Sequence, residues 1–318
     1  MEKKYDVTAL GELLIDFAVN GESEQGNQLF EACPGGAPCN VLAFLQKMEK
    51  KTAFIGKVGN DFFGKQLEQT IMEVGIDASG LQKDDDVHTT LALVHTYPDG
   101  DRDFSFYRNP GADMMLTEEE VPEELIKGTR IFHFGTLSMT NEPVRSATRH
   151  AIKVAKENGA ILSFDPNIRE PLWKDMEDAR AQMAYGLSVC DILKISDNEI
   201  QWFSGKEDYT EGIHMLQQTY QIPLILLSMG KDGSRAYYKD MLVEVPAFLQ
   251  KNTIETTGAG DTFGACCLHH ILKYGLDNLT KQQLKEMLTF ANAAASIITT
   301  RKGALRVMPS LEEIQRLL

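Results

Sequence analysis

The chain has 318 residues, of which 43% are hydrophobic and 25% charged, a composition typical of a soluble globular enzyme. Its formal net charge of −14 argues against a nucleic-acid-binding protein, because phosphate contacts need clustered lysines and arginines. The five cysteines include no Cys-x-x-Cys pair, and the N-terminus has no signal-peptide core, which together predict a cytoplasmic protein. No apolar run reaches the roughly 18 residues of a membrane helix, so we expect a protein that does not enter a membrane.

Strand-like and helix-like runs alternate in the first quarter of the chain. Strands are predicted at Val7–Phe17 and Thr52–Val58, and helices at Pro38–Met48 and Phe62–Val74, with Asp61 as the N-cap of the second helix. The Gly35-Gly36 pair stands just before the first of these helices.

Two β-rich segments, about 12–34 and 88–110, do not fit a simple βαβ series. The second contains predicted strands at Thr89–Tyr97 and Asp103–Tyr107, joined by a turn at Pro98–Asp101. Together the segments predict a small sheet that projects from the main domain. It is either a lid over an active site or a plain extension of the sheet.

From about Arg130 onward, strands alternate regularly with amphipathic helices. This pattern predicts βαβ units and a central, mostly parallel sheet flanked by helices, and the fold class is therefore α/β, in one domain spanning residues 1–318. The strands are expected at Ile131–Leu137, Ile161–Asp165, Ile192–Ile195 and Leu224–Ser228, and the helices at Val144–Glu157, Phe263–Leu272 and Leu284–Ile298. The last two helices are apolar nearly all round, so both should be buried.

The segment Thr256–Phe263 is the most informative motif. Gly258 and Gly260 flank Ala259, Asp261 follows at once, and a helix-like run begins. Small residues let a ligand approach the backbone, and a helix start offers unpaired N–H groups to an anion. A carboxylate beside such a site indicates a phosphate site with a base next to it.

The same glycines also form a loose dinucleotide fingerprint, Gly258-x-Gly260-x-x-x-Gly264. That fingerprint normally opens the first βαβ unit, with an acidic residue about 20 positions later. Here it falls near the end of the chain, and position 280 is a threonine. An NAD-dependent oxidoreductase is therefore a distant alternative.

Three motifs resemble those of the ribokinase-like (PfkB) sugar kinases. Thr256–Phe263 is similar to the C-terminal signature of that family, Gly35–Val41 to its N-terminal glycine signature, and Ile55–Gly64 to the segment between them. The similarity extends over residues 5 to 310. It implies a Rossmann-like ribokinase fold with a small β-sheet lid, and transfer of the ATP γ-phosphoryl group to a sugar hydroxyl.

The resemblance assigns the chemistry to the Gly-Ala-Gly-Asp turn. Asp261 corresponds to the general base of the family, and the backbone N–H groups of Gly258, Ala259 and Gly260 would form the anion hole for the transferring phosphoryl group. Positioned proton removal from a weakly nucleophilic alcohol is worth about 10²–10⁴ in rate. A carboxylate beside a helix N-terminus should be ionised at neutral pH.

The resemblance also implies a sugar subsite. Asp16 would accept hydrogen bonds from hydroxyl groups, and the same pocket would be lined by Gly35, Gly36 and Asn40. In the second lid strand, Phe104, Phe106 and Arg108 share one face, so that Phe106 would cover the sugar ring and Arg108 would bind its oxygens. The alternative is a half-buried strand with a solvated arginine. Arg169 lies in a segment that resembles the Asp-x-Asn-x-Arg motif of fructokinases and 2-keto-3-deoxygluconate kinases, and it would face phosphate or substrate anions.

On the nucleotide side, the resemblance implies ATP contacts from Lys194, Glu199, Ser228, Gly230, Gly233, Thr257 and Asn292. Glu199 would position Mg²⁺ through water. Two positions depart from the family pattern: Ser196 replaces an asparagine, and Glu255 replaces the aspartate of a loop that binds a monovalent cation in relatives. ATP and Mg²⁺ are thus the expected cofactors, with K⁺ as a further candidate.

The segments Asp101–Arg108, Phe132–Ser138 and Thr299–Ala304 resemble fructokinases most closely. The expected reaction is fructose to fructose 6-phosphate, and a homodimer through the lid is the expected assembly. The nearest rival is 2-keto-3-deoxygluconate kinase, whose carboxylate substrate Arg108 and Arg169 would bind. A kinase for a different sugar or a nucleoside is a further candidate, and so is a catalytically silent sugar or nucleotide sensor.

Overall fold

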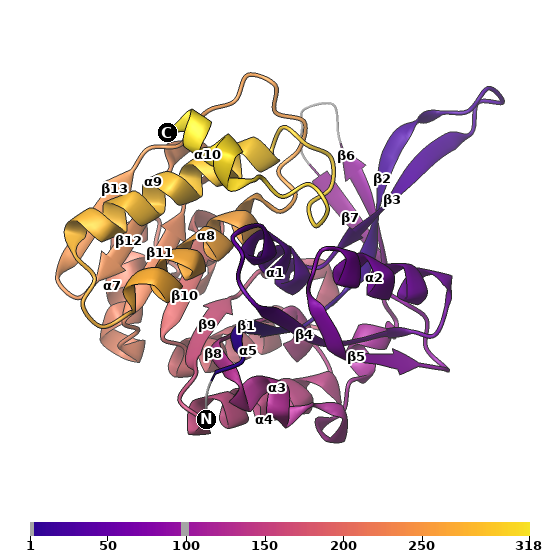
Figure 1. The fold of residues 1–318 in the computed structure, drawn as a ribbon, viewed down its shortest axis with the longest axis horizontal. Coiled ribbons are helices and arrows are strands. Elements are labelled where there is room, and N and C mark those ends of the chain that lie inside the picture. The colour runs from indigo at the N-terminus through magenta and orange to yellow at the C-terminus, as the bar shows by residue number, and fades with distance from the viewer. Residues whose placement is uncertain (1–2, 97–101) are drawn as a thin grey trace.

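The computed structural model describes residues 3–96 and 102–318 and contains a large and a small β-sheet (Figure 1). Among the described residues the large sheet has nine strands, in the order β13-β12-β11-β10-β9-β8-β1-β4-β5. All neighbours from β11 to β5 pair in parallel, whereas β12 and β13 are antiparallel additions at one edge. The strands are β1 (Tyr5–Leu10), β4 (Thr52–Gly59), β5 (Asp77–Asp84), β8 (Thr129–Gly135), β9 (Ile161–Asp165), β10 (Ile192–Ser196), β11 (Leu224–Ser228), β12 (Ser234–Tyr238) and β13 (Met241–Val245).

Helices cover both faces of the large sheet, as predicted for an α/β fold. Alternate residues of β11 belong to different hydrophobic cores: Leu224 and Leu226 face one core, and Ile225 and Leu227 face the other. The first core is covered by α1 (Ala37–Lys47), α2 (Phe62–Glu73), α8 (Ala259–Tyr274), α9 (Lys281–Ile298) and α10 (Leu311–Leu317). The second is covered by α3 (Glu123–Lys127), α4 (Val144–Glu157), α5 (Met176–Val189), α6 (Asp197–Ser204) and α7 (Tyr209–Tyr220).

The small sheet has the order β3-β2-β6-β7, formed by β3 (Gln28–Gly35), β2 (Leu14–Glu22), β6 (Leu91–Thr96) and β7 (Arg102–Tyr107). These strands come from the two segments that predicted a separate small sheet. Strands β2 and β6 are parallel, and the β2–β3 hairpin projects from the body of the molecule (Figure 1). The predicted turn at Pro98–Asp101 lies outside the described residues.

The prediction of one strand over Val7–Phe17 was wrong. Strand β1 ends at Leu10, and the chain enters the other sheet at Leu14. Gly11 allows this crossing, because a Cβ atom there would lie 2.6 Å from Cγ of Pro38 at the start of α1. The crossing places residues 11–16 between the two sheets.

Helix α8 begins four residues before the predicted start at Phe263. Gly258 is its N-cap in the left-handed region, with φ of 75°, where glycine is favoured. Asp261 consequently lies in the first turn of the helix.

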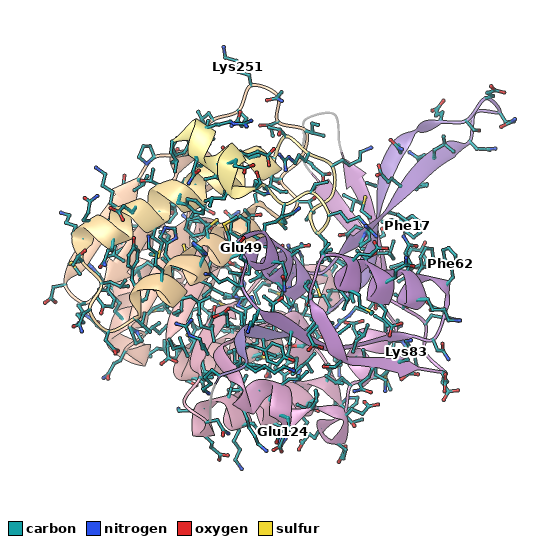
Figure 2. All side chains as sticks on the ribbon, in the orientation of Figure 1. Phe17, Glu49, Phe62, Lys83, Glu124 and Lys251 are labelled. Atoms are coloured by element: carbon teal, nitrogen blue, oxygen red, sulfur yellow. The ribbon has the colours of Figure 1, made fainter. Side chains whose placement is uncertain are left out.

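Charged side chains such as Lys83, Glu124 and Lys251 point away from the body (Figure 2). In the described part of the chain, no helix has the length and apolar character needed to cross a bilayer.

Candidate active site

Polar residues gather where the carboxyl ends of the parallel strands meet. Glu12 follows β1, and Asp165, Ser196 and Ser228 are the last residues of β9, β10 and β11. In open α/β sheets this edge is where ligands bind. A cavity of about 520 Å³, here called the larger cavity, opens at this edge between the two sheets.

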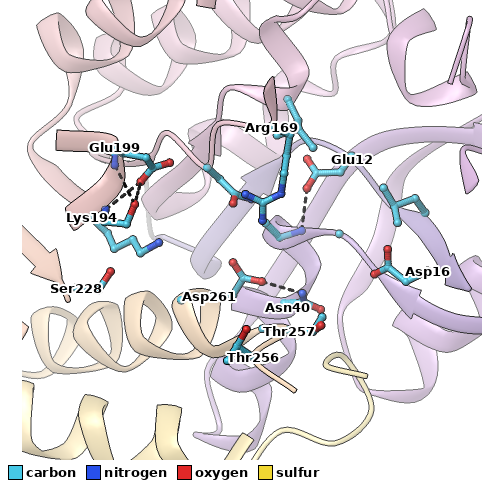
Figure 3. A pocket seen from close by; sticks show the side chains of 18 of the residues that line it. Glu12, Asp16, Asn40, Arg169, Lys194, Glu199, Ser228, Thr256, Thr257 and Asp261 are labelled. Carbon is cyan, nitrogen blue, oxygen red and sulfur yellow. Dashed lines mark hydrogen bonds between the residues drawn. The ribbon is translucent and has the colours of Figure 1, made fainter. Parts of the chain in front are cut away.

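Asp261 points into the larger cavity from the first turn of α8 (Figure 3). Its carboxylate accepts a 2.8 Å hydrogen bond from Nδ2 of Asn40 in α1. Withdrawal from water raises the pKa of Asp261 to about 6, although the Asn40 hydrogen bond, Lys194 and Arg169 oppose the rise. The carboxylate is therefore ionised at neutral pH, as predicted, but with a pKa above that of an ordinary aspartate and not below it.

One backbone N–H group of the Gly-Ala-Gly turn already donates a hydrogen bond within the chain. The N–H of Ala259 donates to the carbonyl of Thr256 at 3.2 Å, and the turn is fixed by the left-handed Gly258. The first N–H groups of a helix have no acceptor within the helix. Gly258 and Gly260 line the larger cavity, whereas Ala259 lines the neighbouring one. Of the three residues predicted for the anion hole, Gly258 and Gly260 thus lie in the wall of the larger cavity.

Asp16 lines the larger cavity from β2. Burial raises its pKa to about 7, and Arg169 partly opposes this effect. Gly35 leaves room for the carboxylate, because a Cβ atom there would lie 2.4 Å from Oδ2 of Asp16. Gly36, at φ of 124°, packs against the carbonyl of Glu12. The two glycines therefore shape the pocket through close packing.

Glu12 is a site residue that the sequence analysis missed. Its side chain lines the larger cavity, is buried, and accepts a 2.8 Å hydrogen bond from the N–H of Ala37 at the start of α1. Burial raises its pKa to about 7. The available signal was a charged residue two positions after the end of the buried parallel strand β1.

The structure describes the side chain of one of the two phenylalanines predicted for the lid. Phe106 lines the larger cavity. Phe104 belongs to β7, but its side chain is outside the described part of the structure.

The structure does not bring Arg108 to the cavity wall. Its guanidinium is buried against Asp113, with Nε and Nη2 at 2.8 and 2.7 Å from Oδ2, and it also donates to Thr140 and to the carbonyl of Leu137. The prediction that Arg108 binds substrate oxygens is corrected, because these partners already occupy the guanidinium.

Arg169 and Lys194 are the cations that line the larger cavity among the described residues. Arg169 follows β9 and donates to the carbonyl of its neighbour Ile168 at 3.2 Å. Lys194 lies in β10 and forms an ion pair with Asp165 at 3.0 Å. Burial lowers the pKa of Lys194, but Asp165, Glu199 and Asp261 more than compensate, so that it is raised overall.

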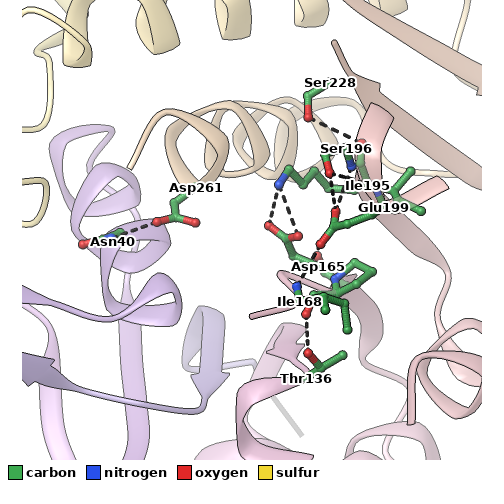
Figure 4. A network of polar contacts seen from close by, with 12 residues as sticks. Asn40, Thr136, Asp165, Ile168, Ile195, Ser196, Glu199, Ser228 and Asp261 are labelled. Atoms are coloured by element: carbon green, nitrogen blue, oxygen red, sulfur yellow. Dashed lines mark hydrogen bonds and ion pairs between the residues drawn. The ribbon is translucent and has the colours of Figure 1, made fainter. Parts of the chain in front are cut away.

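Glu199 joins two loops at the edge of the cavity. One carboxylate oxygen accepts from the N–H of Ile168 at 2.9 Å, and the other accepts from the N–H and the hydroxyl of Ser196 at 2.9 and 2.8 Å (Figure 4). Ser196, where the family pattern has asparagine, is the N-cap of α6 in a capping box. In the described part of the chain, no group of three or more acidic, histidine or cysteine side chains could hold a metal ion.

A second cavity of about 330 Å³ adjoins the first and shares Ser228, Thr256 and Gly260 with it. Its wall includes the predicted Gly230, Gly233 and Asn292, and an unpredicted apolar segment, Ala247–Leu249. We call it the smaller cavity. Thr257 lines the larger cavity.

Asn292 does not present a free amide to the smaller cavity. Its Nδ2 donates to the carbonyls of Val245 and Pro246 at 3.1 and 3.0 Å, and its Oδ1 accepts from the hydroxyl of Ser234 at 2.9 Å. The amide thus fixes the end of β13, and with it the start of the apolar segment. Asn292 also lines the smaller cavity, so the predicted contact with ATP stays a prediction.

Residues 4–311 match the family model for the pfkB family carbohydrate kinases. The chain belongs to this family. It is 39% identical over 314 residues to Fructokinase-1 of Zea mays, covering 98% of this chain and 97% of that protein. Probable fructokinase-2 of Arabidopsis thaliana is 39% identical over 306 residues, which cover 96% of this chain and 93% of the relative.

Solved structures agree with this assignment. Fructokinase from Xylella fastidiosa with bound ATP superposes with a TM-score of 0.89 at 29% identity, over 100% of this chain and 98% of the other. Fructokinase from Vibrio cholerae O395 with fructose, ADP and a calcium ion gives a TM-score of 0.88 at 30% identity, over all of both chains. The ribokinase-like fold and a carbohydrate kinase activity predicted from the sequence are confirmed, and the oxidoreductase alternative is excluded.

In this PfkB kinase, Glu255 makes a contact across the chain. Its Oε1 accepts a 2.6 Å hydrogen bond from the N–H of Gly303. The longer side chain therefore connects the loop before α8 with the segment after α9.

Proposed function

We propose that this kinase transfers the γ-phosphoryl group of ATP to a hydroxyl group of fructose, giving fructose 6-phosphate. One observation carries the proposal: Asp261 faces a polar cavity that meets a more apolar cavity at Ser228, Thr256 and Gly260. The polar cavity suits a sugar and the apolar one a nucleobase. Their junction is the place where a phosphoryl group would pass between them.

Asp261 is the general base in this proposal. A base is most effective when its pKa lies near the working pH, and the pKa of about 6 meets this condition. Asn40 holds the carboxylate through its Nδ2 atom. The Oδ1 atom of Asn40 is buried without a hydrogen-bond partner among the described residues, and a hydroxyl group of the sugar would satisfy it by donating a hydrogen bond.

The phosphoryl group would lie between the first turn of α8 and the two cations. The N–H groups of Gly258 and Gly260 and the side chains of Lys194 and Arg169 supply positive charge where charge develops in the transition state. Asp16 would accept hydrogen bonds from sugar hydroxyls, and Phe106 would cover the ring. These assignments make the small sheet, segments 12–34 and 88–110, the lid of a single kinase domain that spans residues 1–318.

The residues present fit a Mg²⁺ ion bound mainly by the phosphates of ATP. Glu199 already accepts three hydrogen bonds, which suits contact with the ion through water and not direct ligation. Mg²⁺ would neutralise phosphate charge when bound. K⁺ remains a candidate at the loop of Glu255.

The charge of the larger cavity favours fructose over 2-keto-3-deoxygluconate. Its walls contain four carboxyl groups, of Glu12, Asp16, Glu199 and Asp261, and two cations, of which Lys194 is already paired with Asp165. Arg108, which was expected to bind a substrate carboxylate, is held by Asp113. A neutral sugar therefore suits the cavity better than an anionic one.

A substrate panel tests the proposal. The protein is incubated with ATP, Mg²⁺ and one of fructose, 2-keto-3-deoxygluconate, ribose, other sugars or a nucleoside, and ADP release is followed. We expect the highest kcat/KM with fructose, and ³¹P NMR should place the phosphate on O6. A higher kcat/KM with the keto acid would overturn the fructose assignment. If no acceptor gave any turnover, the proposed reaction would be wrong, and the protein would instead be a sugar or nucleotide sensor.

We also propose a homodimer formed through the small sheet. The projecting β2–β3 hairpin exposes Leu29 and Phe30, at 45% and 41% of their surface. A monomeric mass by light scattering, unchanged in Phe30→Glu, would contradict this assembly. A reducing, cytoplasmic environment stays a prediction from the cysteines.

A further inference from the structure

Lys194 is held in one position by Asp165. Its Nζ atom lies 3.0 Å from Oδ2 and 3.2 Å from Oδ1 of Asp165, and the two side chains are 11% and 7% exposed. Asp165 ends β9, and Lys194 lies on the neighbouring parallel strand β10. Asp165 therefore approaches the ammonium group from a rigid element (Figure 4).

The ammonium group packs directly against the first turn of α8. A Cβ atom on Gly260 would lie 3.0 Å from Nζ and 3.6 Å from Cε of Lys194. No backbone strain requires glycine at this position, since its φ is not in the left-handed region. A side chain at residue 260, next to Asp261, would therefore press on the ammonium group and displace it by a few tenths of an ångström.

Three carboxylates compete for this ammonium group. Asp165, Glu199 and Asp261 each raise the pKa of Lys194 against the effect of burial, and the first of them makes the hydrogen bonds. Lysine has a long flexible stem, so its charge needs a partner to be placed accurately. Without Asp165, Glu199 and Asp261 would compete for Lys194, and its position against the first turn of α8 would no longer be fixed.

We propose that Asp165 is a positioning residue for phosphoryl transfer, which keeps the Lys194 ammonium against the Gly258–Gly260 turn and acts on catalysis through Lys194. This inference rests on the proposed function. It assigns to Asp165 neither contact with the substrate nor metal ligation. It also gives a second reason for a small residue at position 260, because the ammonium group of Lys194 needs space there.

A double-mutant cycle tests whether Asp165 acts through Lys194. Kinetic constants for ATP and fructose are measured for the original protein, Asp165→Asn, Lys194→Met and the double variant. We expect Asp165→Asn alone to lower kcat about 10- to 100-fold. In the Lys194→Met background, it should change kcat by less than about twofold. An equal loss in both backgrounds, or an altered Mg²⁺ dependence specific to Asp165→Asn, would overturn the inference.

The pH profile separates positioning from a structural role. In Asp165→Asn, the acid limb of kcat/KM should move to lower pH, because a carboxylate that raises the pKa of Asp261 is removed. An unshifted limb would contradict the proposal. Asp178→Asn is the matched control: it breaks the Arg145–Asp178 ion pair between α4 and α5, and it should change stability with kcat and the pH profile intact.

Two further measurements keep the inference testable. If Asp165→Asn does not fold, Gly260→Ala tests the same geometry, and it should lower kcat at least tenfold by displacing the ammonium; retained kcat would overturn the inference. The cycle can also be run on ATP affinity by calorimetry, where no sugar is needed. An inactive original protein thus refutes the proposed function, whereas additive losses in ATP affinity or kcat refute the role of Asp165.

Discussion

Replacing Asp261 with asparagine should remove activity and stabilise the protein at the same time. The side chain keeps its size and can still accept the hydrogen bond from Asn40. Loss of the proposed base should lower kcat by about 10²–10⁴. The stability effect follows from the raised pKa, because an ionised carboxylate in this position costs folding free energy.

The magnitude follows from linkage. The pKa of Asp261 is raised from 3.8 to about 6, a difference of roughly two units, or about 3 kcal/mol at most. A carboxyl group with a raised pKa binds its proton more tightly in the folded state. The protein therefore loses stability as the pH rises from about 4 to 6, and the loss is constant above that range. The weaker hydrogen bond from Asn40 to a neutral amide reduces the expected net gain of Asp261→Asn at pH 8 to about 2 kcal/mol.

Thermal unfolding at several pH values measures this effect. At pH 8, Asp261→Asn should raise Tm by roughly 3–5 °C, and the difference should shrink toward zero at pH 4. Asp240→Asn, in the exposed turn between β12 and β13, is the matched control and should leave Tm unchanged at every pH. A Tm difference of Asp261→Asn that is independent of pH, or a kcat within tenfold of the original, would refute the reasoning.

Three other variants probe the remaining parts of the site. Asn40→Ala should lower kcat about 10- to 100-fold and move the acid limb of kcat/KM, expected near pH 6, upward, because Asp261 loses the hydrogen bond that lowers its pKa; an unchanged limb in the pH–rate profile would argue against this contact. Arg108→Met should destabilise the protein by about 3–5 kcal/mol in urea unfolding, because Asp113 is left buried and unpaired. If Arg108 has only a structural role, KM for fructose should change less than threefold. A larger rise in KM would indicate that Arg108 binds the substrate. Asn292→Ala should raise KM for ATP about three- to tenfold with KM for fructose unchanged, because the apolar segment after β13 loses its anchor; equal changes in both constants would contradict this separation.

Local sequence signals predicted the helix start near Asp261 well. The glycines and the aspartate of Thr256–Phe263 indicate an anion site at a helix start, and the structure places α8 there. The alternation of strands and helices after residue 130 is also found in the structure. In both cases the signal depends on backbone geometry and burial, which short stretches of sequence encode directly.

The errors arise where a partner from elsewhere in the chain decides the outcome. Val7–Phe17 reads as one strand because both halves are apolar, and its division at Gly11 depends on Pro38 of α1. The alternation in β7 does not show whether the Arg108 guanidinium reaches the cavity or Asp113. Likewise, the sequence marks Asn292 as a polar residue on a buried helix, but it does not show that the end of β13, at Val245 and Pro246, holds the amide.

The proposed site is divided between two sheets, which would let the acceptor pocket and the phosphoryl-transfer residues evolve separately. Asp16 and Phe106 belong to the small sheet, whereas Lys194 lies in the large sheet and Asp261 in a helix packed on it. Substitutions in the small sheet can reshape the acceptor pocket while the transfer machinery stays in place. A single scaffold can thereby diversify into enzymes for different alcohols without rebuilding its phosphoryl-transfer apparatus.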